Sequence, residues 1–417
     1  MNGRDAGADH DTPRTGGDAA SGDAAGGDAT GGDAATGDAT GGDATRGDAV
    51  IGDAAGEDAA TGDDAPEHAP TTLVVGEMIV DAHPDGPGGL AERDTYHRRA
   101  GGAPANVAVG LARLGAPPAF WTRVGDDGFG DFLVETLAAE GTPTTLVERD
   151  PSAPTGLAVV SLDADADREF VLYLDGTAST RLQPGRVADE RLATVDWLHV
   201  GGVELAHEPA RSAVLDLLAR APPDTTVSFD PNARPQLWTD FDYAKTLAAV
   251  LPAVDVLVAS TEDLAPAGYE GAPRDLARIL TDATWGTTTP DTETAAVESA
   301  LDGSGPHTVA VTRGDAGAVA HATESAPWGP ATTSHEGVAV DAVDTTGAGD
   351  AFTAGLIAAL SGEATTTPTT DAGPRDGDTA LAAAVRFANA VAAHSTTARG
   401  AMAALPDRDT VERLLRE

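Results

Sequence analysis

Cysteine is absent from this sequence of 417 residues, and lysine occurs once, at Lys245. Without thiols the chain can form neither a disulfide nor a thiolate metal site, which excludes disulfide scaffolds and zinc fingers. Long apolar runs are missing as well, because no stretch approaches the roughly 18 apolar residues of a membrane span. The first residues lack the apolar core of a signal peptide. We therefore expect a cytoplasmic protein with no membrane partner.

Positive charge is scarce: 26 basic residues stand against 67 acidic ones, for a formal net charge of −41. Residues 1–70 contribute −13 of this charge, so the rest of the chain is strongly acidic in its own right. Such a surface repels nucleic acid and anionic lipid, which excludes both as partners. We interpret it as the adaptation of a halophile to a high-salt interior, where repulsion is screened within a few ångströms. An ordinary acidic protein is the alternative.

Residues 1–70 form a low-complexity tail built from a five-residue unit. From Gly17 to Asp63 a Gly-Asp pair opens almost every unit, and Ala and a small residue usually follow. So little apolar surface cannot offset the entropy of an ordered chain, and we expect this tail to be disordered. A calcium-binding β-helix would need units of nine residues, so the period excludes that reading.

Residues 71–417 have the length of one large α/β domain with an elaboration. Residues 71–80 read as a buried strand, and from residue 195 strands and helices alternate regularly up to a helical region at 262–282. This alternation is typical of a mostly parallel sheet with helices on both faces. Segments 155–163 and 168–174 read instead as a β-hairpin inserted among these units, a plausible cover over a site.

The stretch from Asp344 to Ile357 is the most informative part of the chain. An extended run over 337–343 leads into Gly347-Ala348-Gly349, a turn almost without side chains, and an apolar helix follows it through residue 360. Backbone N–H groups at such a helix start can bind an anion. Asp350 then falls in the first helical turn, where a carboxylate could take a proton from a nucleophile that attacks a bound phosphate. The alternative is that Asp350 has no catalytic role and is stabilised there only by the helix dipole.

Two further segments carry polar residues where an element starts or stops. Asp81 follows an apolar run, at the sheet edge where ligands bind in α/β proteins, although it could be a simple turn residue. Gly101 and Gly102 precede a helix and allow close approach to the backbone. Asn106 lies within that buried helix and needs a partner, either a structural hydrogen bond or a sugar hydroxyl.

The segments Gly101 to Ala108 and Asp344 to Phe352 together resemble the two signatures of the ribokinase-like (phosphofructokinase-B) carbohydrate kinases. The resemblance spans residues 71–415. Asp230 to Trp238 looks most like fructokinases and their relatives, the 2-keto-3-deoxygluconate kinases. The family implies a three-layer α/β/α domain with a small β-lid, here at about 86–100 and 155–176. It also implies ATP in the C-terminal half, a sugar under the lid and, in many members, a lid-to-lid homodimer.

The resemblance also assigns roles to single positions. Asp350 corresponds to the catalytic base, and Gly347, Ala348 and Gly349 to the turn that faces the transferring phosphoryl group. The sugar site would use Asp81, Gly101, Gly102, Asn106 and Arg234. The nucleotide pocket would use Thr312, Gly314, Gly317 and Asn389. Asp344 and the Arg399-Gly400 region correspond to the monovalent cation site of many members, which would hold K⁺.

Two stretches depart from the family pattern. The family often organises Mg²⁺ through water with an Asn-x-x-Glu element, whereas this chain has Ser260-Thr261-Glu262-Asp263, so either Glu262 or Asp263 could serve. Ketodeoxygluconate kinases tend to carry Tyr-Arg near the end of the second lid strand, where a cation suits a substrate carboxylate. Tyr173 is followed here by Leu174 and Asp175, which favours a neutral sugar.

The sequence therefore predicts an ATP- and Mg²⁺-dependent kinase of a neutral hexose, with fructose as the first candidate. A 2-keto-3-deoxygluconate kinase is the nearest alternative. A catalytically silent sugar- or nucleotide-binding regulator on the same fold is a second one, and the intact Gly347 to Asp350 turn argues against it.

Overall fold

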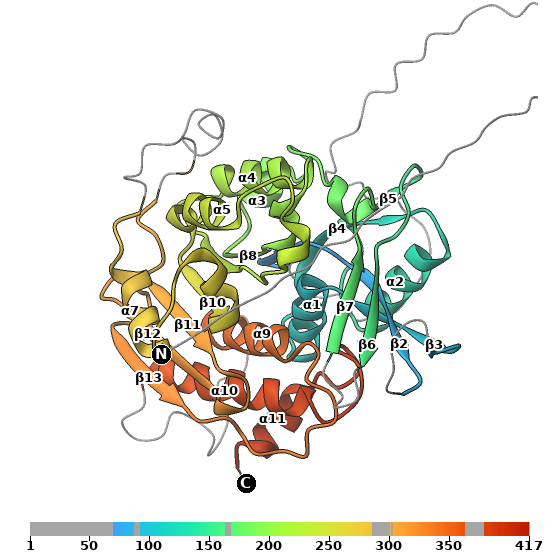
Figure 1. The fold of residues 1–417 in the computed structure, drawn as a ribbon. Helices are drawn as coiled ribbons and strands as arrows, with labels where there is room; N and C mark the ends of the chain where they lie inside the picture. The colour runs from blue at the N-terminus through green and yellow to red at the C-terminus, as the bar shows by residue number, and fades with distance from the viewer. Residues whose placement is uncertain are drawn as a thin grey trace, which may run out of the picture. The chain divides into compact units, whose positions relative to one another are not determined.

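The computed structural model describes residues 70–86, 92–162, 168–285, 301, 303–362 and 379–416 (Figure 1). The repeat tail expected to be disordered lies outside these residues, apart from its last position. So does the acidic turn of the expected hairpin, at 163–167. In the described part of the chain no helix has both the length and the apolar character needed to cross a membrane.

A nine-stranded sheet forms the centre of the domain, in the order β13-β12-β11-β10-β9-β8-β1-β4-β5. The strands from β11 to β5 run parallel, whereas β12 and β13 are antiparallel to their neighbours. The strands are β1 (Thr72–Val75), β4 (Ala119–Gly125), β5 (Val147–Asp150), β8 (Trp197–Gly201), β9 (Thr226–Asp230), β10 (Val256–Ser260), β11 (Thr308–Thr312), β12 (Ala318–Ala322) and β13 (Ala331–His335).

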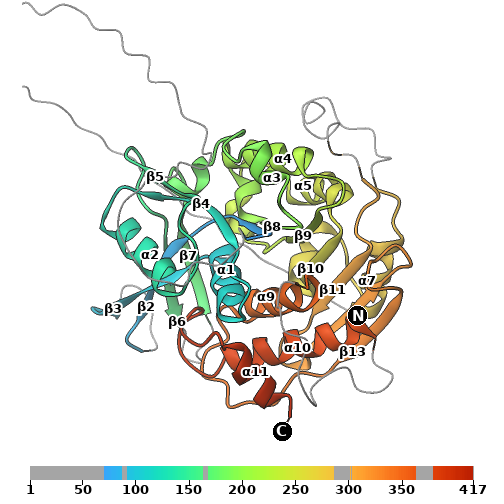
Figure 2. The same cartoon turned by 180° about the vertical axis from the view of Figure 1, so that it is seen from behind.

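Helices cover both faces of this sheet, as the alternation of apolar residues along its strands requires. In β1, Val74 belongs to one buried cluster with helices α1, α9 and α10, while Leu73 and Val75 belong to a second with α4, α5 and α7. The reverse view shows α1, α9 and α10 side by side (Figure 2). The expected α/β/α layers with a mostly parallel sheet are confirmed. The helices are α1 (Ala103–Arg113), α2 (Gly128–Ala139), α3 (Asp189–Leu192), α4 (Ala210–Arg220), α5 (Tyr243–Val250), α6 (Thr261–Leu264), α7 (Pro273–Asp282), α9 (Ala348–Leu360), α10 (Ala380–Ser395) and α11 (Arg408–Leu414).

A second, smaller sheet has the order β3-β2-β6-β7, from β2 (Ile79–Pro84), β3 (Tyr96–Gly101), β6 (Leu157–Leu162) and β7 (Arg168–Tyr173). Its presence corrects one prediction: residues 71–80 are not one strand. β1 ends at Val75, the chain turns at Gly76 with a φ of 149°, and β2 joins the other sheet. An apolar run alone does not reveal such a change of sheet, because both strands are buried.

Other differences lie at the margins of the fold. β5, β13 and α11 were not predicted, and the expected extended run over 337–343 forms no strand. β5 and β13 are the two edge strands of the large sheet, and each is only half-buried, so the alternation signal is weak. None of these differences affects the carboxyl ends of β1, β8, β9, β10 and β11, where the site lies.

Candidate active site

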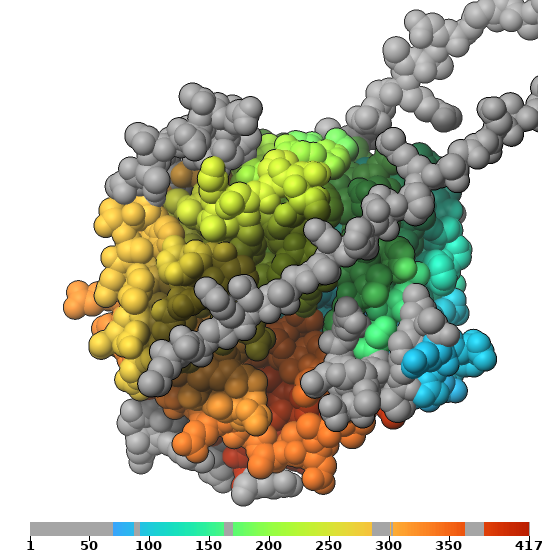
Figure 3. All heavy atoms as spheres, in the orientation of Figure 1, coloured from blue at the N-terminus to red at the C-terminus, as the bar shows by residue number. Residues whose placement is uncertain are grey.

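A cavity of about 580 Å³ lies between the carboxyl ends of the parallel strands, the start of α9 and the inner face of the smaller sheet. The space-filling view shows the surface hollowed between the orange-red segments around α9 and the green segments of the smaller sheet (Figure 3). Its walls contain Asp81, Gly102, Asn106, Arg234 and Asp350. Residues from four separate parts of the sequence therefore meet in one place.

The turn before α9 is built as the sequence predicts. Gly347 is the N-cap of α9 and has a φ of 76°, a backbone conformation that favours glycine. A Cβ at Gly347 would also lie 2.6 Å from the Cβ of Ala401, so a side chain has no room. At Gly349 a Cβ would have no neighbour within 4 Å, since this residue borders open space. The first turn of α9 therefore presents bare backbone to the cavity.

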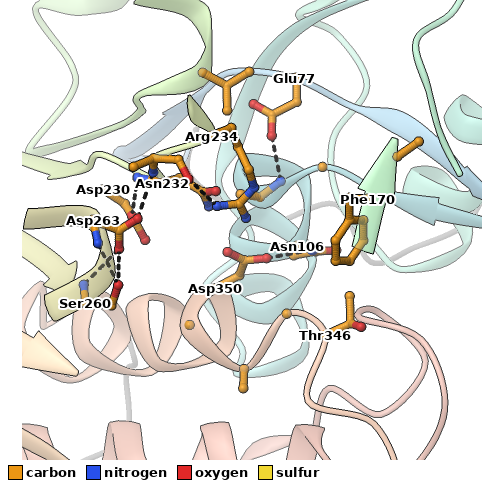
Figure 4. A pocket seen from close by; sticks show the side chains of 18 of the residues that line it. Glu77, Asn106, Phe170, Asp230, Asn232, Arg234, Ser260, Asp263, Thr346 and Asp350 are labelled. Atoms are coloured by element: carbon orange, nitrogen blue, oxygen red, sulfur yellow. Dashed lines mark hydrogen bonds between the residues drawn. The ribbon is translucent and has the colours of Figure 1, made fainter. Parts of the chain in front are cut away.

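Asp350 lies in that first turn and faces the cavity, although its side chain is largely buried (Figure 4). Its Oδ2 accepts a hydrogen bond of 2.7 Å from Nδ2 of Asn106. Burial raises the pKa of Asp350 to about 6, while the bond from Asn106 and the charge of Arg234 oppose this rise. The carboxylate is thus held by an amide beside a cleft, and at neutral pH it is ionised and able to accept a proton.

Asp81 projects from β2 into the same cavity and is also buried. Burial and the charge of Asp350 raise the pKa of Asp81 to about 7. Gly101 lies beside it at the end of β3 and outside the cavity wall, and a Cβ there would come within 2.1 Å of the Asp81 carboxylate. Gly102 lines the cavity with a φ of 103°, and its Cβ would meet the carbonyl oxygen of Glu77 at 2.5 Å. The two glycines therefore make room for Asp81 and for the start of α1.

The loop after β9 supplies the cationic side of the cavity. Arg234 projects between Asp230 and Asp350, and its Nη1 donates to the carbonyl oxygen of Ala233 at 2.8 Å (Figure 4). Asn232 has a φ of 42°, and its N–H donates to Oδ1 of Asp230 at 3.0 Å, which tightens the turn. Burial and the charge of Asp263 raise the pKa of Asp230 well above its usual range.

A second pocket of about 450 Å³ lies on the other side of the Gly347 to Gly349 turn. Its wall includes all four residues expected to hold the nucleotide: Thr312, Gly314, Gly317 and Asn389. The amide nitrogen of Asn389 donates to the carbonyl oxygen of Val385 within α10. Both pockets share Thr312, Gly314, Thr345, Ala348 and Gly349. The turn before α9 and the end of β11 thus form the partition at which ligands in the two pockets would meet.

The three candidate metal ligands lie in different surroundings. Asp263 is engaged, since its Oδ1 accepts from the N–H of Ala233 and its Oδ2 from the N–H and hydroxyl of Ser260. Glu262 is exposed at the cavity wall. Asp344 is buried and accepts 2.9 Å bonds from the N–H groups of Thr346 and Gly400. Within the described ranges no group of three or more acidic or histidine side chains is arranged to hold a metal ion.

Sequence reasoning missed two acids and an aromatic residue of this region. Glu77 lines the cavity, and Glu204 lies buried next to it. Both lie just beyond the carboxyl end of a parallel strand, the kind of place where the sequence analysis expected Asp81. Asp81 itself lies within β2 of the smaller sheet. Phe170 lines the cavity from β7 together with Leu172 and Leu174. The alternation of the hairpin predicted one covered face, but the sequence does not reveal what that face covers.

Comparison with known proteins agrees with this geometry. A model of the pfkB family of carbohydrate kinases matches residues 70–408. A fructokinase of Klebsiella pneumoniae is 37% identical over 347 residues, which span 82% of this chain and 98% of that protein. The ATP-bound fructokinase of Xylella fastidiosa has a TM-score of 0.64 at 27% identity, over 83% of this chain and 98% of that one.

A further solved structure is a double mutant of the fructokinase of Vibrio cholerae O395 with fructose, ADP and a potassium ion bound. It has a TM-score of 0.60 at 29% identity, over 84% of this chain and 100% of that one. The family match covers most of the chain, and the fructokinase of Klebsiella is covered almost completely. The chain therefore belongs to the pfkB family and is a carbohydrate kinase, a phosphotransferase that uses an alcohol group as acceptor.

Proposed function

We propose that this kinase phosphorylates fructose with ATP, and that the cavity holds the sugar while the second pocket holds the nucleotide. One observation carries the proposal: the two pockets meet at the Gly347 to Gly349 turn, and Asp350 faces the sugar side of that turn. A phosphoryl group passing from one pocket to the other would cross this partition. The similarity to fructokinases supports fructose as the acceptor.

The proposed chemistry assigns separate tasks to the turn and to the carboxylate. The N–H groups at the start of α9 stabilise the negative charge that spreads over the oxygens of the transferring phosphoryl group. Asp350 accepts the proton of the attacking hydroxyl, and Asn106 orients the carboxylate through its 2.7 Å bond. Asp81 and Arg234 bind hydroxyl groups of the sugar, and the apolar side chains of β7 cover it.

The charge of the cavity supports a neutral sugar over 2-keto-3-deoxygluconate. Among the described residues that line it, acids outnumber cations: Arg234 is the one Arg or Lys, against Glu77, Asp81, Asp230, Glu262, Asp263 and Asp350. A substrate carboxylate would be repelled by this wall unless several acids were protonated. Arg234 is moreover already close to Asp230 and Asp350 (Figure 4).

The proposal assigns Mg²⁺ to Glu262, acting through water, because the oxygens of Asp263 are occupied by hydrogen bonds. A bound Mg²⁺ would neutralise phosphate charge on the nucleotide. We assign K⁺ to the loop around Asp344, where the buried carboxylate joins the Thr346 and Gly400 segments. The potassium ion in the structure of the Vibrio cholerae enzyme supports the use of K⁺.

Assembly and location complete the proposal. Val171 and Tyr173 on β7 are 36% and 51% exposed, on the side of the smaller sheet that faces away from the cavity. These apolar side chains on an edge strand favour a homodimer through the lid. We place the enzyme in the cytoplasm, where its proposed substrate ATP is available.

A panel of sugars with ATP and Mg²⁺ in molar KCl tests the assignment, with the position of the new phosphate read by NMR. We expect the highest kcat/KM for fructose. A preference for 2-keto-3-deoxygluconate by more than about tenfold, roughly 1.4 kcal/mol of transition-state binding, would reverse the order of the two substrates. Tight sugar or nucleotide binding without any turnover would instead favour the non-catalytic regulator.

A further inference from the structure

Two glutamates lie next to each other at the sugar cavity, Glu77 in its wall and Glu204 behind it. Glu77 follows β1 and Glu204 follows β8, and these strands are parallel neighbours, so both side chains arise at the same edge of the sheet. Glu77 is 4% exposed and Glu204 is 2% exposed. Two ionised carboxylates in such a place would repel each other strongly. Their juxtaposition therefore needs a proton or a cation.

The unsatisfied oxygens of the two acids indicate a proton. Oε2 of Glu77 and Oε2 of Glu204 are both buried, and neither has a hydrogen-bond donor among the described residues. A proton on one of the two carboxyl groups would supply that donor to the other. Burial raises the pKa of Glu77 to about 7 and that of Glu204 well above its usual range, so the pair retains this proton near neutral pH.

The pair also supports the start of α1. The N-cap of this helix is Gly102, which has no side chain to cap it, and no acidic residue follows in the first turn. Oε1 of Glu77 accepts instead a 2.8 Å hydrogen bond from the N–H of Ala103 (Figure 4). One turn later α1 carries Asn106, whose amide binds Asp350. A single helical turn therefore connects the glutamate pair with the proposed base.

Close packing surrounds the side of the pair that faces away from the cavity. Pro104 fills the space beside Gly76 and Gly201, where an added Cβ would come within 2.2 Å and 2.7 Å of its Cγ. The same Cβ positions would lie 3.0 Å and 3.5 Å from Oε2 of Glu204. On this side the pair therefore packs against backbone and a proline ring, whereas Glu77 also borders the cavity that Arg234 lines.

We propose that Glu77 and Glu204 share one proton and act as positioning residues, which fix the start of α1 and thereby hold Asn106 against Asp350. This inference rests on the proposed roles of Asn106 and Asp350. The other charged groups that face the pair are Asp350 on α9, Asp81 on β2, and Arg234 in the loop after β9, which lines the same cavity as Glu77. The two acids oppose loss of the shared proton, whereas the cation favours it.

Glu204→Gln tests the proposal, because glutamine keeps the shape and a hydrogen-bond donor but cannot lose a proton. The folded wild type holds its proton at pH values at which an unfolded glutamate has released it. Its stability therefore falls as the pH rises from the ordinary glutamate value toward the pKa of the pair. We expect the Tm of Glu204→Gln to exceed that of wild type by about 3 °C more at pH 8.5 than at pH 5.5.

The activity profile should change in the same variant. We expect kcat of wild type to decline at alkaline pH as the pair loses its proton, and this decline to move up by about one pH unit or vanish in Glu204→Gln. Glu190→Gln removes an exposed carboxylate of α3 and serves as the control, with both profiles unchanged. If Glu204→Gln folds poorly, Glu77→Gln provides the mirror-image replacement.

The Tm measurement does not depend on the assigned substrate, so it separates this inference from the proposed function. If the wild type does not phosphorylate fructose, the proposed function is refuted but the shared proton is not. Tm and kcat curves of both glutamine variants that run parallel to wild type over the whole pH range would show that no proton is shared. A pH-independent drop in kcat would likewise overturn the positioning role and leave only a structural one.

Discussion

Asp350 is the residue on which the proposed chemistry depends. Asp350→Asn preserves the shape and can still bond to Asn106, but an amide cannot take up a proton from a hydroxyl. We expect kcat to fall by a factor of about 10³ or more, while calorimetry shows fructose and ATP bound with dissociation constants within about threefold of wild type. Asp409→Asn, at an exposed position of α11, is the control. Turnover near the wild-type level would remove Asp350 from the mechanism.

The ionisation of Asp350 should also set the acid limit of activity. Its pKa is raised to about 6 by burial, and below that pH the protonated side chain cannot act as a base. The hydrogen bond from Asn106 favours the ionised form, so Asn106→Ala should raise this pKa further, by about one unit. The acid limb of kcat at saturating substrate would then move to higher pH. An equal loss of kcat at every pH would contradict this role of Asn106.

At the scale of elements, two substitutions in the turn before α9 should affect stability and catalysis separately. Gly347→Ala forces a side chain into a left-handed backbone and against Ala401, so we expect a loss of about 2 kcal/mol or more, read as a lower Tm. In Gly349→Ala the new methyl group meets open space, so Tm should stay within about 2 °C of wild type. We expect kcat to fall at least about tenfold, because this methyl group borders both pockets. The reverse pattern would contradict the assignment of this turn to phosphoryl transfer.

The elements that position the site could be predicted from the sequence where neighbouring residues carry the signal. Regular alternation predicted the parallel sheet, and the glycines before α1 and α9 predicted both turns, since no other residue adopts those conformations easily. Hydrogen-bond partners far apart in the sequence could not be predicted. The sequence suggested either a structural bond or a sugar hydroxyl for Asn106. The structure shows a structural bond, but its partner is Asp350, 244 positions away.

Two pairs of acidic residues show why the rest of the site could not be predicted from the sequence. Glu262 and Asp263 were equivalent candidates for the Mg²⁺ ligand in the sequence. Only the structure shows that the Asp263 carboxylate accepts hydrogen bonds from the N–H groups of Ala233 and Ser260. Glu77 and Glu204 attracted no attention because their strands are adjacent in space but far apart in the chain. Pairing between parallel strands joined by long connections leaves no local signature.

At the scale of the whole molecule, the net charge of −41 sets the conditions under which the protein should be stable. The self-repulsion of such a surface is strong in dilute buffer and screened in concentrated salt. We expect the Tm to fall by about 10 °C or more between molar and 0.1 M KCl, and sucrose of equal osmolality not to restore it, since a neutral solute does not screen charge. A Tm independent of KCl would refute the halophilic interpretation.

The turn between the two pockets leaves little room for change of sequence, and this limits how the enzyme can evolve. A side chain added at Gly347 or Gly349 should cost stability or turnover, so few substitutions are tolerated at the surface across which the phosphoryl group would pass. New acceptor preferences are open to selection through residues that line the sugar cavity alone, such as those of β7, β2 and the loop after β9. Relatives with different acceptors should therefore diverge there while their nucleotide pockets stay interchangeable.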